Sequence, residues 1–290
     1  MSDEVLREDF GKVSRLTLNR PDRLNAINDA LRGALEGHLR DIARDDGISV
    51  VIIRGAGRAF CSGYDLKALP GNSTESSAYY QGGAAVTADR ERLRETAERL
   101  MWLWNFPKPT IAQVHGYCLG GGGEMAAMCD ITICADTAKF GHPAGRAVGI
   151  PVTLALWPLK MGLQKAKEYM FTGDFIPGPE ARELGLANRC VPQDRLDEEV
   201  MDYAQRVAMV PLPALSIHKH VANRWFEVLG VRTMMAEGVE FDVLFHQTSA
   251  ATDFAKLVQV EGLQKALDLR DGPFRRPKLE PQPQEDVSNA

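Results

Sequence analysis

The chain has 290 residues, of which 44% are hydrophobic and 25% charged, and its net charge at pH 7 is −5. These values are ordinary for a soluble globular protein, and the acidic balance argues against a nucleic-acid-binding surface, which needs a basic face. No run of about 18 apolar residues occurs, so we expect no membrane span. The first ten residues are acidic and lack the apolar core of a secretory signal, which favours a cytoplasmic protein.

The cysteines and histidines give no sign of a disulfide framework or a metal site. The cysteines are odd in number, scattered, and set among apolar residues without a Cys-x-x-Cys pair, which indicates reduced thiols. They are Cys61, Cys118, Cys129, Cys134 and Cys190. His218 and His220 flank Lys219 in a helical stretch, a poor arrangement for metal ligands. We therefore predict no metal.

Strands and helices alternate through the first two thirds of the sequence. Apolar runs rich in Val and Ile predict strands, and Asn28 or Asp29 can cap the first helix. Pro107 and Pro109 end the second long helix. The strands are predicted at 13–19, 48–54, 111–114, 131–135 and 187–191, and the helices at about 29–44, 84–104 and, broken near Gly162, 152–171.

Only helices are predicted beyond residue 194, at about 194–209, 213–229, 232–247 and 253–269. The remaining residues carry four prolines and many charges, a composition typical of disorder. Alternation of strands and helices implies an α/β fold with a parallel sheet. We therefore predict a core at 1–193, a helical region at 194–270 and a disordered tail at 271–290. Residues 71–77 are polar and predicted to be mobile.

Residues 110–130 read as a strand, a glycine turn and a helix. The strand is followed by four glycines, Gly120 to Gly123, and then by Glu124 among strong helix formers. The first turn of a helix presents unpaired N–H groups and the positive end of the helix dipole, so it stabilises a developing negative charge. Glu124 lies in that turn, where it can exchange a proton with a ligand. Tight packing of the strand against the helix would explain the same glycines with no ligand site. The local pattern alone does not decide between these two interpretations.

A second loop follows the strand at 48–54 and contains Cys61, Ser62 and Gly63. In parallel sheets, ligands bind at loops beyond the carboxyl ends of strands. Each of the two loops can offer a backbone N–H, and two such donors that converge on one oxygen form an oxyanion hole.

Several motifs resemble the crotonase family, the enoyl-CoA hydratase/isomerase superfamily. They occur in the family's order and cover about residues 12 to 270. They are N-R-P-x-x-L-N-A at 19–26, R-A-F-C-S-G-Y-D-L at 58–66, G-Y-C-L-G-G-G-G-E at 116–124, M-C-D at 128–130, K-F-G at 139–141 and T-G-D at 172–174.

The resemblance implies an acyl-CoA enzyme, with enoyl-CoA hydration as the first expectation. The thioester oxygen would be held by the amides of Ser62 and Gly121, and Glu124 would be the catalytic acid and base. Further contacts with coenzyme A would come from Arg23, Leu24, Ser62, Gly63, Tyr64 and Asp65. Coenzyme A would enter as part of the substrate, with no other cofactor. The family fold is a β-β-α spiral core with a helical C-terminal part, assembled as a trimer or a dimer of trimers.

One departure from the family pattern touches the acyl end of the expected pocket. Hydratases of the family carry a second glutamate after Phe-Gly-x-Pro, whereas this chain has Ala144 there. Glu124 could then perform both proton transfers in a hydratase, move one proton between carbons in an isomerase, or serve a hydrolase, decarboxylase or lyase. His142 or Arg146 could replace the missing group, or could have only structural roles.

Three other classes of function remain open. Gly116-Tyr117-Cys118-Leu119-Gly120 fits the Gly-x-nucleophile-x-Gly turn of a hydrolase with a cysteine nucleophile. A non-catalytic acyl-CoA-binding protein would also tolerate the loss of one glutamate. A dinucleotide-binding domain is the weakest alternative, because Phe60 replaces the third glycine of that motif.

Overall fold

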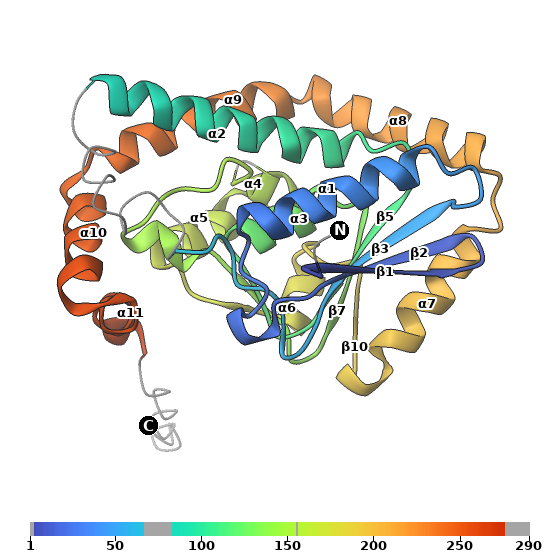
Figure 1. Cartoon of the computed structure of the whole chain (residues 1–290), viewed down its shortest axis with the longest axis horizontal. Helices are drawn as coiled ribbons and strands as arrows, with labels where there is room; N and C mark the ends of the chain where they lie inside the picture. Colours follow the sequence, from blue (N-terminus) through green and yellow to red (C-terminus); the bar gives the residue numbers. More distant parts are fainter. Residues whose placement is uncertain (1–2, 67–82, 155, 276–290) are drawn as a thin grey trace, which may run out of the picture.

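The computed structural model describes residues 3–66, 83–154 and 156–275. Two sheets and a set of surrounding helices make up this part of the chain (Figure 1). The strands are β1 Val5–Phe10, β2 Val13–Leu18, β3 Val50–Gly55, β4 Ala59–Cys61, β5 Thr110–Val114, β6 Tyr117–Leu119, β7 Ile131–Ala135, β8 Lys139–Gly141, β9 Ile176–Pro177 and β10 Arg189–Val191. The helices are α1 Asp29–Ala43, α2 Gly83–Trp104, α3 Gly121–Met128, α4 Leu156–Met161, α5 Leu163–Thr172, α6 Gly178–Glu183, α7 Leu196–Val207, α8 Leu212–Val228, α9 Val231–His246, α10 Ser249–Glu261 and α11 Leu263–Asp271.

The larger sheet has the strand order β1-β2-β3-β5-β7-β10. All its neighbours pair in parallel except the hairpin of β1 and β2. Strands β3 and β5 are buried nearly throughout because both faces of the sheet are covered. Helix α7 packs on one face through Leu196, Val200 and Ala204, and α1, α2 and α3 belong to the core on the other face.

A second, four-stranded sheet has the order β4-β6-β8-β9. Strands β4, β6 and β8 follow directly after β3, β5 and β7, and they pair in parallel with one another. The chain therefore repeats a unit of a long strand, a short strand and a helical segment. This repetition brings the ends of β4 and β6 side by side, and each end leads into one of the two glycine-containing loops.

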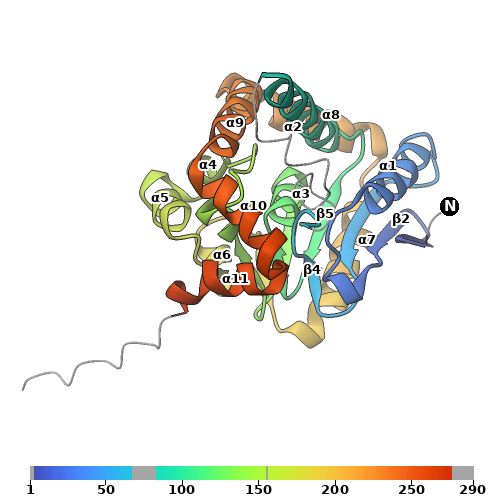
Figure 2. The same ribbon diagram turned by 60° about the vertical axis from the view of Figure 1, so that its left-hand side comes forward.

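Helices α8 to α11 follow α7 at the C-terminal end, and the buried residues of α9 belong to the main core. Helix α9 lies along α2, α8 meets the C-terminal end of α2 at Trp104, and α10 and α11 turn downward from the end of α9 (Figures 1 and 2). Arg146 lies in a 3-10 turn at Pro143–Arg146, and its Nη1 contacts Asp271 Oδ1 of α11 at 3.0 Å. Helix α11 therefore comes back against the core.

The predicted elements are largely present, with four corrections. Strand β1 was missed, and β4, β6 and β8 lie in stretches where no strand was predicted, because three-residue strands carry no periodic signal. The helix predicted at 253–269 is two helices that meet at Gly262, where φ is +81°. The predicted tail begins too early, because Asp271 ends α11 and a 3-10 turn covers Gly272–Phe274. The stretch predicted to be mobile at 71–77 and the part of the predicted disordered tail from 276 onward lie outside the described residues.

Candidate active site

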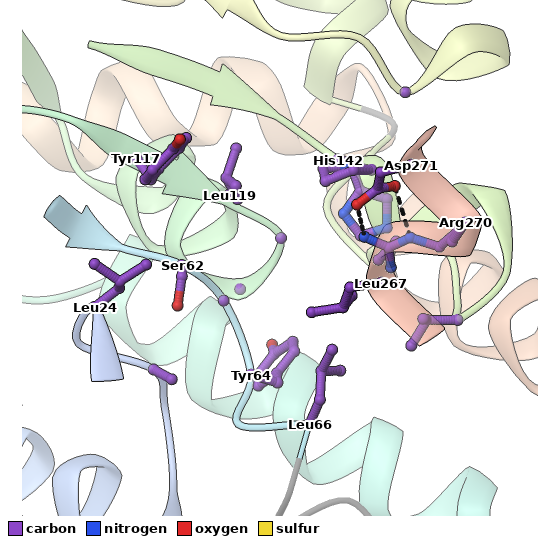
Figure 3. Close-up of a pocket in the computed structure, with 18 of the residues that line it drawn as sticks. Leu24, Ser62, Tyr64, Leu66, Tyr117, Leu119, His142, Leu267, Arg270 and Asp271 are labelled. Atoms are coloured by element: carbon purple, nitrogen blue, oxygen red, sulfur yellow. Dashed lines mark hydrogen bonds and ion pairs between the residues drawn. The ribbon is translucent and has the colours of Figure 1, made fainter. Parts of the chain in front are cut away.

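A cavity of about 880 Å³ lies where the small sheet meets the 3-10 turn at Pro21–Arg23 and helix α11 (Figure 3). Its wall combines the two predicted glycine loops with residues that sequence reasoning did not connect to them. Among the lining residues are Arg23, Leu24, Arg58, Ser62, Gly63, Tyr64, Asp65, Tyr117, Gly120, Gly121, His142, Ala144, Arg146, Leu267 and Arg270. The prediction that the two loops share one site therefore agrees with the geometry.

The two loops approach each other at their glycines. Gly63 has φ +104° and Gly120 has φ +48°, backbone conformations that other residues rarely adopt. A Cβ atom on Gly63 would lie 3.0 Å from the carbonyl oxygen of Leu119 and 3.4 Å from the amide nitrogen of Gly121. Glycine is needed here because the backbones of the two loops are nearly in contact.

The amide of Ser62 is not available to a ligand. Its N–H donates to the carbonyl oxygen of Leu24 at 2.9 Å, and the N–H of Asp65 donates to Ile27 at the same distance. The prediction that Ser62 supplies an oxyanion donor is therefore wrong. The parallel bridge between Ile27 and Tyr64 is formed by the carbonyl oxygen of Gly63 and the N–H of Asp65, the two neighbours of Tyr64. The amide of Tyr64 itself therefore has no acceptor among the described residues.

The amide of Gly121 lies close to this segment. Gly121 is the first residue of α3, so its N–H has no acceptor within the helix. It also donates to no other group in the described part of the chain. The positive end of the helix dipole adds to the attraction for an anion. The amides of Gly121 and Tyr64 are therefore two unpaired donors at the point where the two glycine loops meet beside the cavity.

Glu124 lies in the first turn of α3 and is 2% exposed. Its Oε2 accepts a hydrogen bond from the hydroxyl of Tyr64 at 2.6 Å. Its Oε1 accepts longer ones, from the N–H of Thr153 at 3.3 Å and from the hydroxyl of Thr153 at 3.4 Å. Burial raises the pKa of Glu124 above 4.5, although these hydrogen bonds oppose the shift. A buried carboxyl whose pKa is raised is suited to proton transfer near neutral pH.

The side chain of Tyr64 contacts Glu124 and forms part of the cavity wall. Its ring lies against Gly121, where an added Cβ would be 2.8 Å from the ring carbon Cζ. Tyr64 lines the cavity and Glu124 does not. Sequence reasoning assigned Tyr64 only a contact with coenzyme A, because nothing in the local pattern shows that its hydroxyl reaches residue 124.

His142 borders the cavity next to Gly120, and its ring is neutral. Its Nε2 lies 2.8 Å from the carbonyl oxygen of Gly149, which can only accept, so the proton is on Nε2. Burial lowers the pKa of His142 to about 4. Its Nδ1 is buried and has no partner among the described residues. His142 therefore offers a hydrogen-bond acceptor to the site and not a proton.

Arg146 lines the cavity, but other protein groups engage its guanidinium. It donates to the carbonyl oxygen of Thr172 at 2.8 Å and to Asp174 and Asp271 at 3.0 Å. It also stacks on Phe274, with 3.8 Å between the guanidinium carbon and the ring centroid. These contacts indicate that Arg146 fastens the wall of the cavity, which is one of the two roles considered from sequence.

Asp65 also has a structural partner. Its Oδ2 lies 3.1 Å from Nη1 and Nη2 of Arg20, which fixes the loop beyond Tyr64. By contrast, the exposed guanidinium groups of Arg23 and Arg58 have no acidic partner in the described part of the chain.

The cysteine nucleophile is contradicted by the structure. Cys118 lies within β6 and is 0% exposed, and burial raises the pKa of its thiol well above the ordinary value. A thiol attacks as the thiolate, so Cys118 is unsuited to this role. Among the described residues, no cluster of three His, Cys, Asp or Glu side chains could hold a metal ion. None of the described helices combines the length and apolarity needed to cross a membrane.

Comparison with known sequences gives matches along nearly the whole chain. A family model described as enoyl-CoA hydratase/isomerase matches residues 8–275. A Rhizobium meliloti protein named "Probable enoyl-CoA hydratase" is 32% identical, over 94% of this chain and 98% of that protein. A Clostridium acetobutylicum protein named "Short-chain-enoyl-CoA hydratase" is 30% identical, over 90% of this chain and 97% of that protein.

Solved structures agree with these matches. An enoyl-CoA hydratase/isomerase from Xanthobacter autotrophicus Py2 superposes with a TM-score of 0.85 at 34% identity, covering 95% of this chain and all of that chain. An enoyl-CoA hydratase from Mycobacterium smegmatis superposes with a TM-score of 0.86 at 29% identity, covering 93% and 94%. The predicted fold, a crotonase-like α/β core with a helical C-terminal region, is confirmed.

Proposed function

This chain belongs to the enoyl-CoA hydratase/isomerase family, and on that premise we propose that it catalyses the reversible addition of water to a 2-enoyl-CoA. One observation carries the proposal: the unpaired amides of Tyr64 and Gly121 border one cavity, with the carboxyl of Glu124 behind them. The names of the relatives point the same way.

The two amides suit the charge that develops during hydration. When water attacks C3 of a 2-enoyl thioester, negative charge moves onto the thioester oxygen. Two fixed N–H donors stabilise that oxyanion, and the loss of one such donor typically costs about 2.7–4 kcal/mol of transition-state stabilisation. Glu124 takes the proton of the attacking water, for which its raised pKa is suited.

Two exposed arginines support a nucleotide ester as the substrate. Arg23 and Arg58 lie on the wall of the cavity, and neither has an acidic partner in the part of the chain that the structure describes. Guanidinium groups bind phosphates through charge-assisted hydrogen bonds. We assign them to the phosphates of coenzyme A, which lets the thioester arm extend toward Gly121.

An oligomer forms part of the proposal. Ile217, Val221, Trp225 and Val228 recur along one face of α8 and are 62–70% exposed, whereas a helix normally buries such a face. Contiguous exposed apolar surface marks an interaction site. We propose that this face joins copies of the chain in a trimer or a dimer of trimers.

Ala144 favours a second candidate, an enoyl-CoA isomerase. A double bond can be moved along an acyl chain by one carboxyl that removes a proton from one carbon and returns it to another. Ala144 places a methyl group where the family pattern has the second glutamate. Glu124 would therefore be the carboxyl used in either reaction, hydration or isomerisation.

The test is to incubate the protein with 2-enoyl, 3-enoyl and branched acyl-CoAs and to measure product masses. We expect a 2-enoyl-CoA to gain one water. An unchanged mass with a shifted double bond would identify the isomerase instead, and free coenzyme A would identify a hydrolase. Binding without conversion of any ester would overturn the enzymatic proposal in favour of a non-catalytic acyl-CoA-binding protein.

A further inference from the structure

Hydration requires two proton transfers, and this chain has Ala144 where the family pattern places a second glutamate. A proton must leave the water that attacks C3, and another must reach C2. Glu124 accounts for the first transfer. Ala144 has no group for the second, so another side chain at the cavity must supply that proton if the two transfers are separate.

We propose that Tyr64 is a second catalytic residue, whose phenol gives the proton to C2 while Glu124 takes one from water. This inference rests on the proposed function and extends it to a residue pair. The supporting contact is the 2.6 Å hydrogen bond from the hydroxyl of Tyr64 to Oε2 of Glu124. Tyrosine is an established general acid and base in enzymes.

The position of the Tyr64 side chain fits this role. The ring lies against Gly121, where a Cβ would be 2.8 Å from Cζ, so the hydroxyl is close to the start of α3. Tyr64 also lines the cavity that receives the ester (Figure 3). Its own amide is one of the two unpaired donors. One residue therefore brings an oxyanion donor and a phenol to the same end of the substrate.

Two other polar side chains at the cavity, His142 and Arg146, are unsuited to donate the proton. His142 has its proton on Nε2, where it is engaged by Gly149, and its Nδ1 can only accept. Arg146 is engaged by Thr172, Asp174 and Asp271, and a guanidinium does not release its proton. The phenol of Tyr64 carries a proton and contacts the carboxyl that can replace it.

The step balances without a further reactant. The water oxygen bonds to C3, a water proton passes to Oε2 of Glu124, and the electrons of the C2=C3 bond form an enolate on the thioester. The enolate carbon C2 then takes the hydroxyl proton of Tyr64, and the thioester carbonyl re-forms. The proton on Glu124 moves to the phenolate oxygen. Both residues return to their starting states, and one water has been added.

The hydrogen bond between the two residues couples these transfers. While Glu124 is ionised, it accepts from the Tyr64 hydroxyl and directs that proton away from the substrate. Once Glu124 has taken the water proton, it becomes a donor to the phenol oxygen. The hydroxyl proton is then released toward C2, so protonation of Glu124 and delivery of the proton to C2 occur in order.

The test measures proton transfer at C2 separately from hydration. Butyryl-CoA has no double bond to hydrate, and by microscopic reversibility the group that protonates C2 also removes its proton. The wild-type protein, Tyr64→Phe and Tyr169→Phe are incubated with butyryl-CoA in D2O, and deuterium at C2 is followed by mass. Tyr169→Phe is a matched control, because its hydroxyl donates to Glu180 at 2.5 Å and it does not line the cavity.

We expect Tyr64→Phe to slow exchange and hydration by about 10²-fold or more, the usual contribution of a general acid, with the Kd for butyryl-CoA within about threefold. Tyr169→Phe should match the wild type. Exchange in Tyr64→Phe at the wild-type rate, or no exchange in the wild type, overturns the inference. Hydration by the wild type is scored separately, so the proposed function can stand when the inference fails and can fail when the inference stands.

A second variant separates acid chemistry from packing. Incorporation of 3,5-difluorotyrosine at position 64 keeps the ring and its contacts but makes the phenol more acidic. If the phenol delivers the proton, the pH at which the exchange rate changes on the alkaline side of its pH profile should be lower than with tyrosine. An unchanged pH profile overturns the catalytic role, because a residue that only supports Glu124 would not respond to phenol acidity.

Discussion

The phenol oxygen of Tyr64 lies 2.6 Å from Oε2 of Glu124, although 60 positions separate the two residues in the chain. Tyr64 follows β4 and Glu124 follows β6, and the parallel pairing of these two short strands brings the residues together. The same pairing sets the amide of Gly121 beside Gly63. The proposed acid–base pair and the proposed oxyanion donors are thus brought together by one contact between two loops.

Replacement of Glu124 by glutamine should remove activity and leave binding intact. The amide keeps the shape of the side chain and a carbonyl oxygen for the Tyr64 hydroxyl, but it cannot accept a proton. We expect kcat to fall by about 10²- to 10⁴-fold and the Kd for the CoA ester to stay within about threefold, measured by steady-state kinetics and calorimetry. A variant that retains a tenth of the wild-type kcat would exclude Glu124 as the base.

Helix α3 could be predicted from sequence because its signals are local. Four glycines followed by helix formers mark the start of α3, and Glu124 is found in the first turn as predicted. Asn28 likewise caps α1, its side chain accepting from the N–H of Leu31 at 2.9 Å. Such features depend on neighbours within a few positions, so the sequence alone specifies them.

The sequence could not show that the amide of Tyr64, and not that of Ser62, is free to bind a ligand, because this depends on a single backbone angle. Along an ordinary extended strand, residues two apart orient their N–H groups the same way, and so Ser62 and Tyr64 would be equivalent. Gly63 has φ +104° and breaks that alternation. The amide of Ser62 then faces Leu24, while that of Tyr64 is left without an acceptor among the described residues.

Motif residues with structural roles were equally hard to separate from binding residues. Asn25 is fully buried, and its Nδ2 donates to the carbonyl oxygens of Ala56 and Ala59 at 2.9 and 2.8 Å. Asp65 pairs with Arg20. Both residues lie in family motifs, and their partners are distant in sequence, so only the fold shows that they hold the loops in place.

Removal of the guanidinium of Arg58 should weaken binding of the full CoA ester. If Arg58 binds a phosphate, Arg58→Ala should raise KM about tenfold, the equivalent of about 1.4 kcal/mol, with kcat unchanged. The same variant should act normally on an N-acetylcysteamine thioester, which lacks every phosphate.

Arg195→Ala is the control for this prediction, because Arg195 is exposed and pairs with Glu198 outside the cavity. It should leave KM unchanged for both esters. An equal loss with both esters in Arg58→Ala would show that Arg58 supports the loop and does not contact a phosphate.

A buried cluster behind the site should make stability depend on pH. His246 Nδ1 lies 2.7 Å from Asp89, and Nε2 lies 3.5 Å from Asp242; Arg92 contacts Asp89 at 2.8 Å. Burial opposes the charged imidazolium, but the hydrogen bond to Asp89 and the charges of Asp242 and Asp89 outweigh it and raise the pKa of His246 above 6.5. The stabilisation is therefore fully present below about pH 6.5 and is lost as pH rises through the raised pKa.

Replacement of His246 by glutamine should reveal this dependence. We expect the free energy of unfolding at pH 6 to fall by about 3 kcal/mol, because a buried charge loses its partner, and to fall by less at pH 9. Urea denaturation at both pH values measures the difference, with His218→Gln as the exposed control. Equal losses at the two pH values would show that His246 is neutral in the folded protein at pH 6.

The apolar face of α8 should hold the chain in an oligomer. Trp225 is 64% exposed at the centre of this face, and large aromatic side chains at the centre of an interface contribute most of its binding energy. Trp225→Asp should therefore convert the protein to a monomer in light scattering after gel filtration, with an unchanged circular dichroism spectrum. Val260→Asp changes a residue of α10 that is 78% exposed and should leave the mass unchanged. A wild-type protein that is already monomeric would leave this face without the proposed role.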